Sequence, residues 1–187
     1  MYRVEPLTVE RWEDFSRLCR AMGPNRSCWC MWWRDDGQPK NLTSRERALQ
    51  LVERSVHPVG LLAYSDEKVV GWAAVSPREE YPRLNKRRDT APVDDQEGTW
   101  VLPCLFVVEE YRHKGVTKAL VTAAVEFARS EGARVIEAVP GDPATQVRTP
   151  SASYTGTVGL FGSTGFSEVA RRTKKGRVVM RRDLQID

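Results

Sequence analysis

Hydrophobic residues recur at every third or fourth position in four stretches of the chain, which is the spacing of one face of a helix. The strongest series runs over 116–131 and ends before a glycine. The same spacing predicts a helix over 9–22, with Thr8 as its cap, a second over 43–55 and a short one over 157–164.

Apolar runs bounded by polar turns predict strands between and after these helices. Residues 59–64 and 69–75 flank a polar four-residue turn, as in a hairpin. Residues 100–108 are apolar throughout, which is typical of a central strand that is covered on both faces. Shorter strands are predicted over 134–139, 166–171 and 178–182.

Pro103 interrupts the apolar run at 100–108. Proline has no N–H to donate to a neighbouring strand, so a central strand that contains one is expected to bulge, or to part from its neighbour, at that point. The alternative is a local irregularity without further consequence.

The order of these elements predicts an α/β fold, with a parallel crossover at the centre of its sheet. Segment 77–98 is rich in proline and charge and has no apolar period, so it is predicted to be a long exposed loop, and a second loop is predicted over 141–153. No internal repeat divides the chain. We expect one domain over 1–187, made of an N-terminal helical segment (1–58), a central sheet (59–140) and a C-terminal segment (141–187).

Composition places the chain among globular proteins. Of its 187 residues, 41% are hydrophobic and 29% are charged, which excludes a disordered tail, a collagen-like repeat and a membrane bundle. The net charge of +4 suits polyanionic ligands but does not by itself indicate nucleic-acid binding. Acids and a proline near the N-terminus replace the apolar stretch of a signal peptide, which predicts a cytoplasmic protein without membrane contact. Its four cysteines are then expected as thiols, and the single residue between Cys28 and Cys30 argues against a metal site.

The junction between the strand at 100–108 and the helix at 116–131 carries candidate chemistry. A helix N-terminus leaves its first amides unpaired and carries a partial positive charge, so a glycine-containing turn at this point can hold a pyrophosphate. Gly115 lets the backbone approach such a ligand. The alternative is a solvated capping turn. The cationic or proton-donating side chains around the turn are Arg112, His113, Lys114 and Lys118.

Residues 107–117 resemble the central motif of the GNAT superfamily of acyl-CoA N-acyltransferases. In that family a buried strand runs into Arg/Gln-x-x-Gly-x-Gly/Ala and a long helix, and the amides of the turn hold the pyrophosphate of acetyl-CoA. Here Arg112 and Gly115 match the motif, whereas Thr117 replaces the small residue at its last position. A second family segment, an aromatic residue followed after three residues by Gly-Phe, is similar to 161–166.

The resemblance implies a GNAT-like mixed sheet of six to seven strands with helices on both faces, and acetyl-CoA as co-substrate without a metal. It also implies that the central strand splays from its neighbour, so that the pantetheine arm lies in the gap like an added strand. The residues that it implies for binding acetyl-CoA are Phe106, Val107, Val108, Arg112, His113, Lys114, Gly115, Val116, Thr117, Lys118 and Phe161.

Direct transfer to an amine needs a neutral amine, a polarised thioester carbonyl and a proton for the departing thiolate. The resemblance implies that the backbone amide of Val107 or Phe106 polarises the carbonyl. The candidate bases are Glu97, just before the buried strand, and Glu137, within the next strand. A charge within an apolar strand, as at Glu137, is costly unless it is used or paired. The alternative is that Glu137 points to water. The tyrosine that commonly acts as the acid corresponds to Phe161, which cannot donate a proton. Tyr154 is therefore the candidate acid, with packing as its alternative role, and the thiolate can also leave without enzymatic protonation.

Aromatic residues are concentrated at 28–34, in the segment that lines the acceptor site in the family. The resemblance implies that Trp29, Trp32 and Trp33 wall a pocket for the amine of a small molecule or peptide, and core packing is the alternative. A polyamine-like acceptor would favour an acidic pocket, which the acids of the 77–98 loop could supply. Those acids are Glu79, Glu80, Asp94, Asp95 and Glu97.

The sequence thus predicts an N-acetyltransferase that moves an acetyl group from acetyl-CoA to a primary amine in a ternary complex. It leaves the oligomeric state open, with a homodimer as one option. One alternative is a non-catalytic acyl-CoA sensor, which the phenylalanine at position 161 favours. The other is a nucleic-acid-binding protein that uses the basic residues of 171–182, and solvated strand faces explain those residues more simply.

Overall fold

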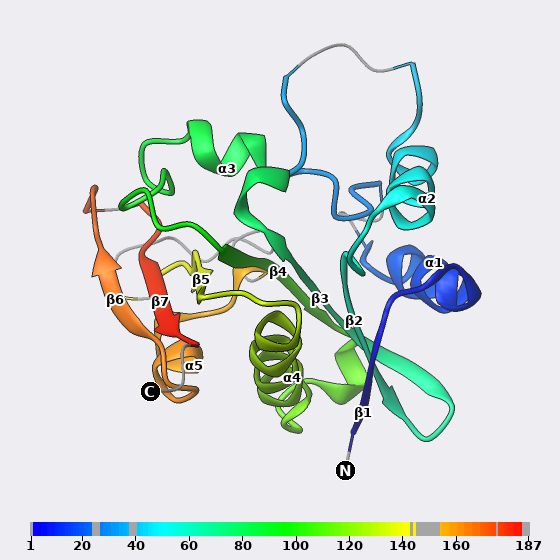
Figure 1. Cartoon of the computed structure of the whole chain (residues 1–187). Helices are drawn as coiled ribbons and strands as arrows, with labels where there is room; N and C mark the ends of the chain where they lie inside the picture. Colours follow the sequence, from blue (N-terminus) through cyan, green and yellow to red (C-terminus); the bar gives the residue numbers. More distant parts are fainter. Residues whose placement is uncertain are drawn as a thin grey trace.

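The computed structural model describes residues 2–23, 27–37, 41–142, 144, 154–174 and 176–184. Seven strands form one sheet, with α1 and α2 on one side of it and α4 and α5 on the other (Figure 1). The strands are β1 (Arg3–Pro6), β2 (Gly60–Ser65), β3 (Lys68–Pro77), β4 (Thr99–Val107), β5 (Val135–Ala138), β6 (Ser167–Ala170) and β7 (Val179–Asp183). The helices are η1 (Val9–Arg11), α1 (Trp12–Arg20), α2 (Ser44–Arg54), η3 (Arg78–Glu80), α3 (Pro82–Lys86), η4 (Glu109–Tyr111), α4 (Val116–Ser130) and α5 (Val158–Gly162).

The strand order is β1-β2-β3-β4-β5-β7-β6. Strands β4 and β5 pair in parallel, and α4 forms the crossover between them, while the other neighbouring pairs are antiparallel. This confirms the predicted mixed sheet with a parallel crossover at its centre. Within the described ranges, no helix is long and apolar enough to span a membrane.

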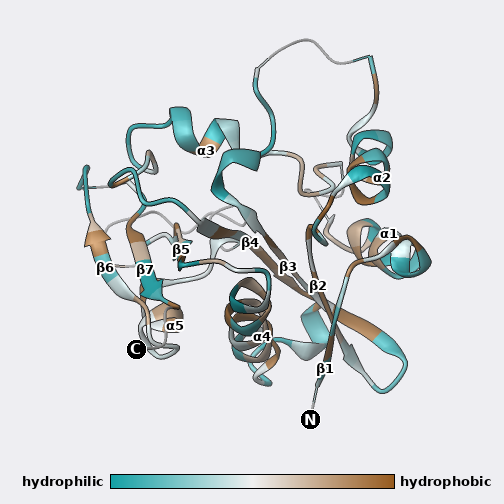
Figure 2. Ribbon diagram, viewed as in Figure 1, coloured by the Kyte–Doolittle hydropathy of each residue, from teal (hydrophilic) through white to brown (hydrophobic). Residues whose placement is uncertain are grey.

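The two faces of the sheet carry separate hydrophobic cores. Helix α4 packs Leu120 and Ala124 against one face, where Leu105 and Val107 of β4 also lie. Helix α1 covers the other face with a cluster of aromatic rings that includes Phe15. The central strands are accordingly the most hydrophobic part of the ribbon (Figure 2).

Strand β1 and the helices η3 and α3 were not predicted from the sequence. Strand β1 is a four-residue edge strand that is held by antiparallel pairing with β2, and its own sequence has little apolar character. The prediction that 77–98 is a plain exposed loop is wrong, because it contains η3 and α3, with Tyr81 and Leu84 fully buried. Pro82 starts α3 at a position that suits proline, but a helix this short shows no detectable period. Most of the loop expected over 141–153 lies outside the described residues.

Strand β4 bulges beside Pro103 and then loses its neighbour β5. The register between β3 and β4 shifts between Ala74 and Ser76, where β4 contributes one extra residue. The pairing of β4 with β5 covers Thr99 to Leu102 and stops there, although β4 continues to Val107. None of the described strands pairs with this edge of β4 beyond Pro103. The bulge and the parting expected from the proline are thereby confirmed.

Candidate active site

The turn that precedes α4 exposes backbone amides. Gly115 is the N-cap of α4 and has a φ of 87°, and no side chain caps the helix. The amide of Ala119 donates to the carbonyl of Gly115 at 3.0 Å, so the amides of 116–118 precede the first hydrogen bond of the helix. A Cβ at Gly115 would meet no atom within 4 Å, which leaves open space beside these amides. The α4 N-terminus therefore fits an anionic group such as a pyrophosphate.

The side chains of this turn are largely exposed, but they are not equivalent. Arg112 donates through Nε to the carbonyl of Val107 at 3.2 Å, so it braces the end of β4. The Lys114 ammonium lies 5.6 Å from the centre of the Tyr111 ring, and His113 and Lys118 are exposed. Val116 is buried and Thr117 is half-buried, so these two residues offer their amides rather than their side chains.

The open edge of β4 carries alternate backbone groups. The amide of Val108 donates to the carbonyl of Val70 at 3.0 Å, so Val108 faces β3 and, by the alternation of an antiparallel ladder, Phe106 faces β3 as well. Leu105 and Val107 therefore turn their N–H and C=O groups toward the gap left by β5. Of the three β4-end residues expected to bind acetyl-CoA, Phe106, Val107 and Val108, Val107 alone has this orientation. Leu105 was not predicted.

Glu137 is buried in an ion-pair network. It is 1% exposed, its Oε2 accepts a hydrogen bond from Arg78, and its Oε1 accepts from Arg181 at 2.7 Å. Arg78 also donates to the carbonyl of Thr90, and burial lowers the pKa of its guanidinium. The Glu137 side chain is therefore not exposed to water, and it borders the hollow described in the next paragraph rather than the cavity that follows. Both of its oxygens are held by guanidinium groups, which makes it a poor base.

Glu97 lies at the wrong end of β4 for the chemistry expected of it. It is exposed, and it precedes Val107 by ten residues, which corresponds to roughly 30 Å of extended strand. With Glu79, Asp94 and Asp95 it lines a separate hollow of about 410 Å³. None of these four acids lines the cavity described next.

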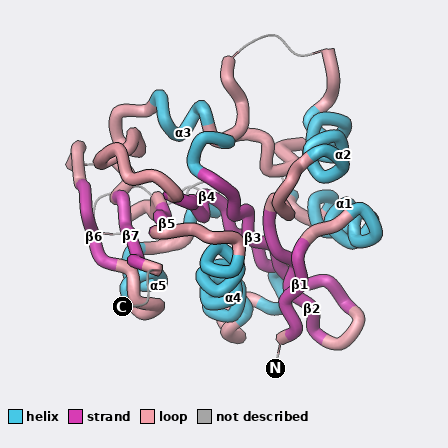
Figure 3. The backbone as a smooth tube through the Cα atoms, viewed as in Figure 1, coloured by secondary structure: helices cyan, strands magenta, loops and turns pink. Residues whose placement is uncertain are grey.

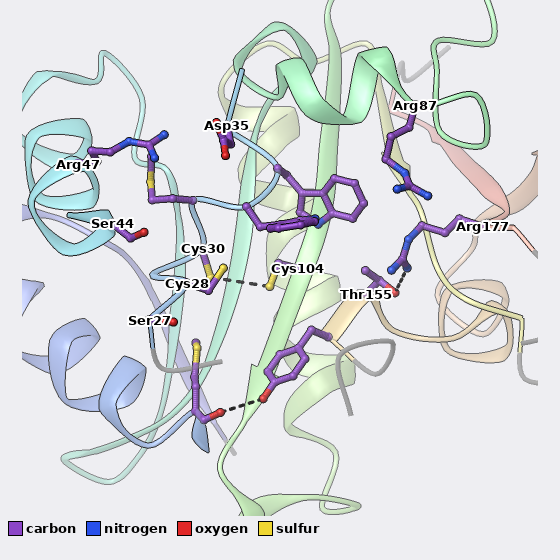
Figure 4. Close-up of a pocket in the computed structure, with 15 residues that line it drawn as sticks. Ser27, Cys28, Cys30, Asp35, Ser44, Arg47, Arg87, Cys104, Thr155 and Arg177 are labelled. Carbon is purple, nitrogen blue, oxygen red and sulfur yellow. Dashed lines mark hydrogen bonds between the residues drawn. The ribbon is translucent and has the colours of Figure 1, made fainter. Parts of the chain in front are cut away.

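A cavity of about 580 Å³ lies on the α1 face of the sheet, beside the gap between β4 and β5 (Figure 4). Its volume falls within the usual range of small-molecule sites. The segment at 27–37, which was expected to line an acceptor site, forms much of its wall. The described residues that line it are Met22, Ser27, Cys28, Cys30, Met31, Trp32, Trp33, Asp35, Ser44, Arg47, Arg87, Cys104, Tyr154, Thr155 and Arg177.

Hydrogen bonds fix the segment at 27–37 to the end of β3. Arg34 has a side chain that is 6% exposed, and it donates to Ser76 at 2.6 Å and to Glu80. Arg83 bonds Asp35 at 2.6 Å, and its backbone amide donates to the carbonyl of Trp33. Figure 3 shows this loop beside the turn that leads into α3, so the aromatic wall of the cavity rests on a fixed support.

The three tryptophans of this segment have different positions. Trp33 is buried and lines the cavity, with the Arg177 guanidinium 5.3 Å from its ring centre. Trp32 also lines the cavity but is 55% exposed, and it stacks under Arg83. Trp29 does not line the cavity; it packs against α1, with its ring 5.8 Å from that of Trp12. Two of the three residues thus occupy the wall, and the third belongs to the core.

Tyr154 lines the cavity, whereas Phe161 does not. The Tyr154 ring stacks on Phe106 of β4 at 5.9 Å, and its hydroxyl donates to the carbonyl of Met22 at 3.1 Å. Phe161 is fully buried on the α4 face of the sheet, in edge contact with Phe166. The tyrosine is therefore close to the gap, but its proton already has an acceptor.

Three thiols that were not predicted as site residues line the cavity. The Sγ atoms of Cys30 and Cys104 lie 3.8 Å apart, and the indole N–H of Trp72 donates to Cys30 at 3.0 Å. The contact with Cys104 and burial raise the pKa of the Cys30 thiol well above its usual value, and burial raises that of Cys28. Cys28 and Cys30 therefore contribute neutral, polarizable surface at neutral pH.

Four of the arginines in 171–182 already have partners. Arg171 pairs with Glu168 and Asp142, and Arg181 pairs with Asp94 and Glu137. Arg172 and Arg182 donate to backbone carbonyls. Because these guanidinium groups already have partners, the argument for nucleic-acid binding loses its main support.

The sequence matches the family model described as "Acetyltransferase (GNAT) family" over residues 5–147. This span covers most of the chain and includes β4 and the turn before α4. The chain belongs to this acetyltransferase family. Membership in the GNAT family supports acetyl transfer from an acyl-CoA donor as its general activity. A comparison with curated proteins found no match.

Solved structures of GNAT proteins share the fold over almost their whole length. The N-acetyltransferase PaiA of Thermoplasma acidophilum, determined with coenzyme A, has a TM-score of 0.59 at 15% identity, covering 98% of this chain and 99% of that one. The ribosomal-protein-alanine N-acetyltransferase of Brucella melitensis has a TM-score of 0.59 at 19% identity, covering 97% and 99%. The putative acetyltransferase YncA of Salmonella typhimurium, determined with acetyl-CoA, has a TM-score of 0.58 at 16% identity, covering 98% and 94%. At these identities the likeness shows the fold alone.

Proposed function

We propose that this GNAT protein transfers an acetyl group from acetyl-CoA to a primary amine while both substrates are bound. The observation that carries the proposal is the opening of the sheet beside Pro103, where β5 leaves β4. Cys104, in the part of β4 beyond the opening, lines a cavity of about 580 Å³. At the end of the same strand lies the exposed N-terminus of α4.

The turn and the strand edge suit the two parts of the donor. The amides of 116–118, assisted by Lys114 and Lys118, are suited to the pyrophosphate. The backbone groups of Leu105 and Val107 are suited to the amide groups of the pantetheine arm, which would join β4 as an extra strand. When bound, the thioester supplies an activated acetyl group and a thiolate leaving group.

The cavity is suited to the acceptor. Cys104 of β4 forms part of its wall, so an amine in the cavity lies beside the strand whose edge holds the thioester. The rings of Trp33 and Tyr154 help to exclude water from this region. An N–H group on the open edge of β4 polarises the carbonyl that the amine attacks.

Proton transfer in this proposal relies on water rather than on a carboxylate. Among the described residues that line the cavity, Asp35 is the one carboxylate, and it is ion-paired with Arg83 at 2.6 Å. An alkyl ammonium with a pKa of ~10.4 would therefore lose its proton to solvent before attack. A thiolate with a pKa of ~8.5 can leave without an enzymatic acid.

Thermal melting with acetyl-CoA tests the donor site. A ligand present at ~100 times its dissociation constant adds about 2.7 kcal/mol to stability. For a chain of this size, that corresponds to a rise in Tm of roughly 5–10 °C. We expect Lys114→Ala combined with Lys118→Ala to weaken binding about tenfold and to reduce the rise, because two cations near the pyrophosphate are lost. The matched control Arg54→Ala, an exposed cation on α2, should leave the rise intact.

The second candidate function is an acyl-CoA sensor. It is favoured by the ion pair of Asp35 with Arg83, which leaves the described wall of the cavity without a free carboxylate base. A turnover assay distinguishes an enzyme from such a sensor. Release of coenzyme A is followed by mass spectrometry with a panel of primary amines. An enzyme releases coenzyme A and forms the matching acetamide, whereas a sensor shows the rise in Tm without either product. If acetyl-CoA produces no rise in Tm, both candidates are contradicted.

A further inference from the structure

The charges that line the cavity are predominantly positive. Among the described residues of its wall, Arg47, Arg87 and Arg177 are cationic and Asp35 is acidic. Asp35 is already ion-paired with Arg83. The cavity therefore presents unmatched positive charge, which is the opposite of the acidic pocket expected for a polyamine-like acceptor.

Asp89 accepts hydrogen bonds from the side chain of Arg87 and from the backbone of Arg177. Arg87 donates to Asp89 through Nε and Nη2, both at 3.1 Å, and the backbone amide of Arg177 donates to the same carboxylate at 3.3 Å. In Figure 4 the two guanidinium groups lie near one another on the same side of the cavity, and that of Arg177 is directed to Thr155. One carboxylate cannot neutralise both cations, so the space between them favours an additional anion.

Hydrogen bonds from one nitrogen of the Arg177 guanidinium fix its position, and its other nitrogens can bind a ligand. Its Nη1 donates to the carbonyl of Val139 at 3.2 Å and to the hydroxyl of Thr155. Its Nε and Nη2 donate to no acceptor in the described part of the chain. Burial lowers the pKa of Arg177, against the effect of Asp89, and the charge of Arg87 lowers it further, so a bound anion would stabilise the charged form.

These arginines border the same cavity as the reacting strand. Arg177 precedes β7, which belongs with β5 to the half of the sheet that parts from β4. Cys104 of β4 lines the same cavity. An acceptor that fills the cavity can therefore place one end on the arginines and the other end beside β4.

We propose that the acceptor is a small primary amine that also carries a carboxylate, phosphate or phosphonate group, and that Arg87 and Arg177 bind this anionic group. The inference rests on the acetyltransferase activity proposed above and narrows its substrate class. Polyamines are poor acceptors on this account, because the cavity repels additional positive charge.

Matched amines test the substrate class. Each pair differs in the anionic group: L-phenylalanine against 2-phenylethylamine, and 2-aminoethylphosphonate against ethanolamine, with spermidine as the polyamine. We expect kcat/KM to be at least tenfold higher for the acid-bearing member of at least one pair, and spermidine to be the poorest substrate. Equal or better turnover of the neutral amines, or of spermidine, would overturn the proposal.

Charge-removing variants test the residues. Arg87→Gln should narrow the ratio of kcat/KM within a pair from at least tenfold to below threefold, while Arg87→Lys should retain part of the preference. Arg54→Gln, on the exposed face of α2, is the matched control and should keep the full ratio. The Kd for acetyl-CoA should be the same in all three variants. If Arg87→Gln weakens acetyl-CoA binding and leaves the ratio unchanged, the arginines serve the donor and the proposal is wrong.

Equilibrium binding distinguishes a failure of this proposal from a failure of the proposed function. The tryptophans Trp32 and Trp33 line the cavity, so their fluorescence reports on its occupation. The probes are 3-phenylpropionate and its neutral amide, neither of which can be acetylated. Preferential binding of the carboxylate, lost in Arg87→Gln and unaccompanied by turnover of any amine, would support the anion site and contradict the acetyltransferase. Turnover of amines without preferential carboxylate binding would support the acetyltransferase activity and contradict the anion site.

Discussion

Replacing Glu137 by glutamine should destabilise the protein strongly and change its catalysis little. The carboxylate is 1% exposed and lies between Arg78 and Arg181, whose side chains are 8% and 17% exposed. Removing one partner of a buried ion pair leaves an uncompensated charge and costs about 3–5 kcal/mol. Because glutamine keeps the shape and part of the hydrogen bonding, we expect the lower end of this range, about 3 kcal/mol. At roughly 2–4 °C per kcal/mol for a chain of this size, Tm should fall by about 6–12 °C.

Urea unfolding of Glu137→Gln gives the free energy of unfolding, and coenzyme A release at 25 °C gives kcat. The matched control is Glu126→Gln, which breaks an exposed pair with Arg129 on α4 and should cost less than about 0.5 kcal/mol. Combining Glu137→Gln with Arg78→Met should cost less than the sum of the two single changes, because the orphaned charge is then removed. A variant of unchanged stability whose kcat falls a hundredfold would refute this reasoning and restore Glu137 as the base.

Four further predictions concern other parts of the molecule. Burial raises the pKa of Asp89, but hydrogen bonds from Arg87 and Arg177 outweigh burial, so the folded-state pKa is lower than the unfolded-state value. The carboxylate therefore stabilises the fold above about pH 3.9, the unfolded-state pKa. This contribution disappears as the pH falls through the lower folded-state pKa. The stability difference between the wild type and Asp89→Asn in urea should therefore shrink below pH 4, and a constant difference down to pH 2.5 would contradict the assignment. Gly115→Ala should lower the free energy of unfolding in urea by about 1–2 kcal/mol, because a φ of 87° strains an L-residue. Unchanged stability would contradict this assignment of backbone strain. Iodoacetamide at pH 7 should alkylate Cys30 much more slowly than a free cysteine, with the rate rising as the pH rises, and rapid labelling by mass spectrometry would contradict the raised pKa. Finally, log kcat/KM for a simple alkylamine should rise with a slope near 1 from pH 6 to 9, and a plateau below pH 8 would indicate an enzymatic base.

The sequence predicts those parts of the fold whose cause is local. Helix α4 follows from its apolar period, and the bulge in β4 follows from the missing N–H of Pro103. Strand β1 and helix α3 depend on contacts with distant elements, since the first pairs with β2 and the second is fixed by the burial of Leu84. No local pattern distinguishes such short elements from loops.

The candidate site divides in the same way. The turn before α4 has a local signature, a glycine at a helix start among cations, and it was predicted. The partners of Glu137 come from positions 59 and 44 residues away in the sequence, so the spacing of residues gives no sign of the ion pairs that argue against its role as a base. Arg87 and Arg177 are 90 residues apart in the sequence and line the same cavity, so their proximity becomes visible in the folded chain alone.

The most direct test of the account is a crystal structure of the protein with acetyl-CoA. We predict pyrophosphate oxygens within about 2.7–3.2 Å of the amides of 116–118. The pantetheine arm should be hydrogen-bonded to the backbone of Leu105 or Val107, in the gap beside Pro103. Acetyl-CoA bound elsewhere, with the gap between β4 and β5 empty and the amides of 116–118 facing solvent, would contradict the central claim.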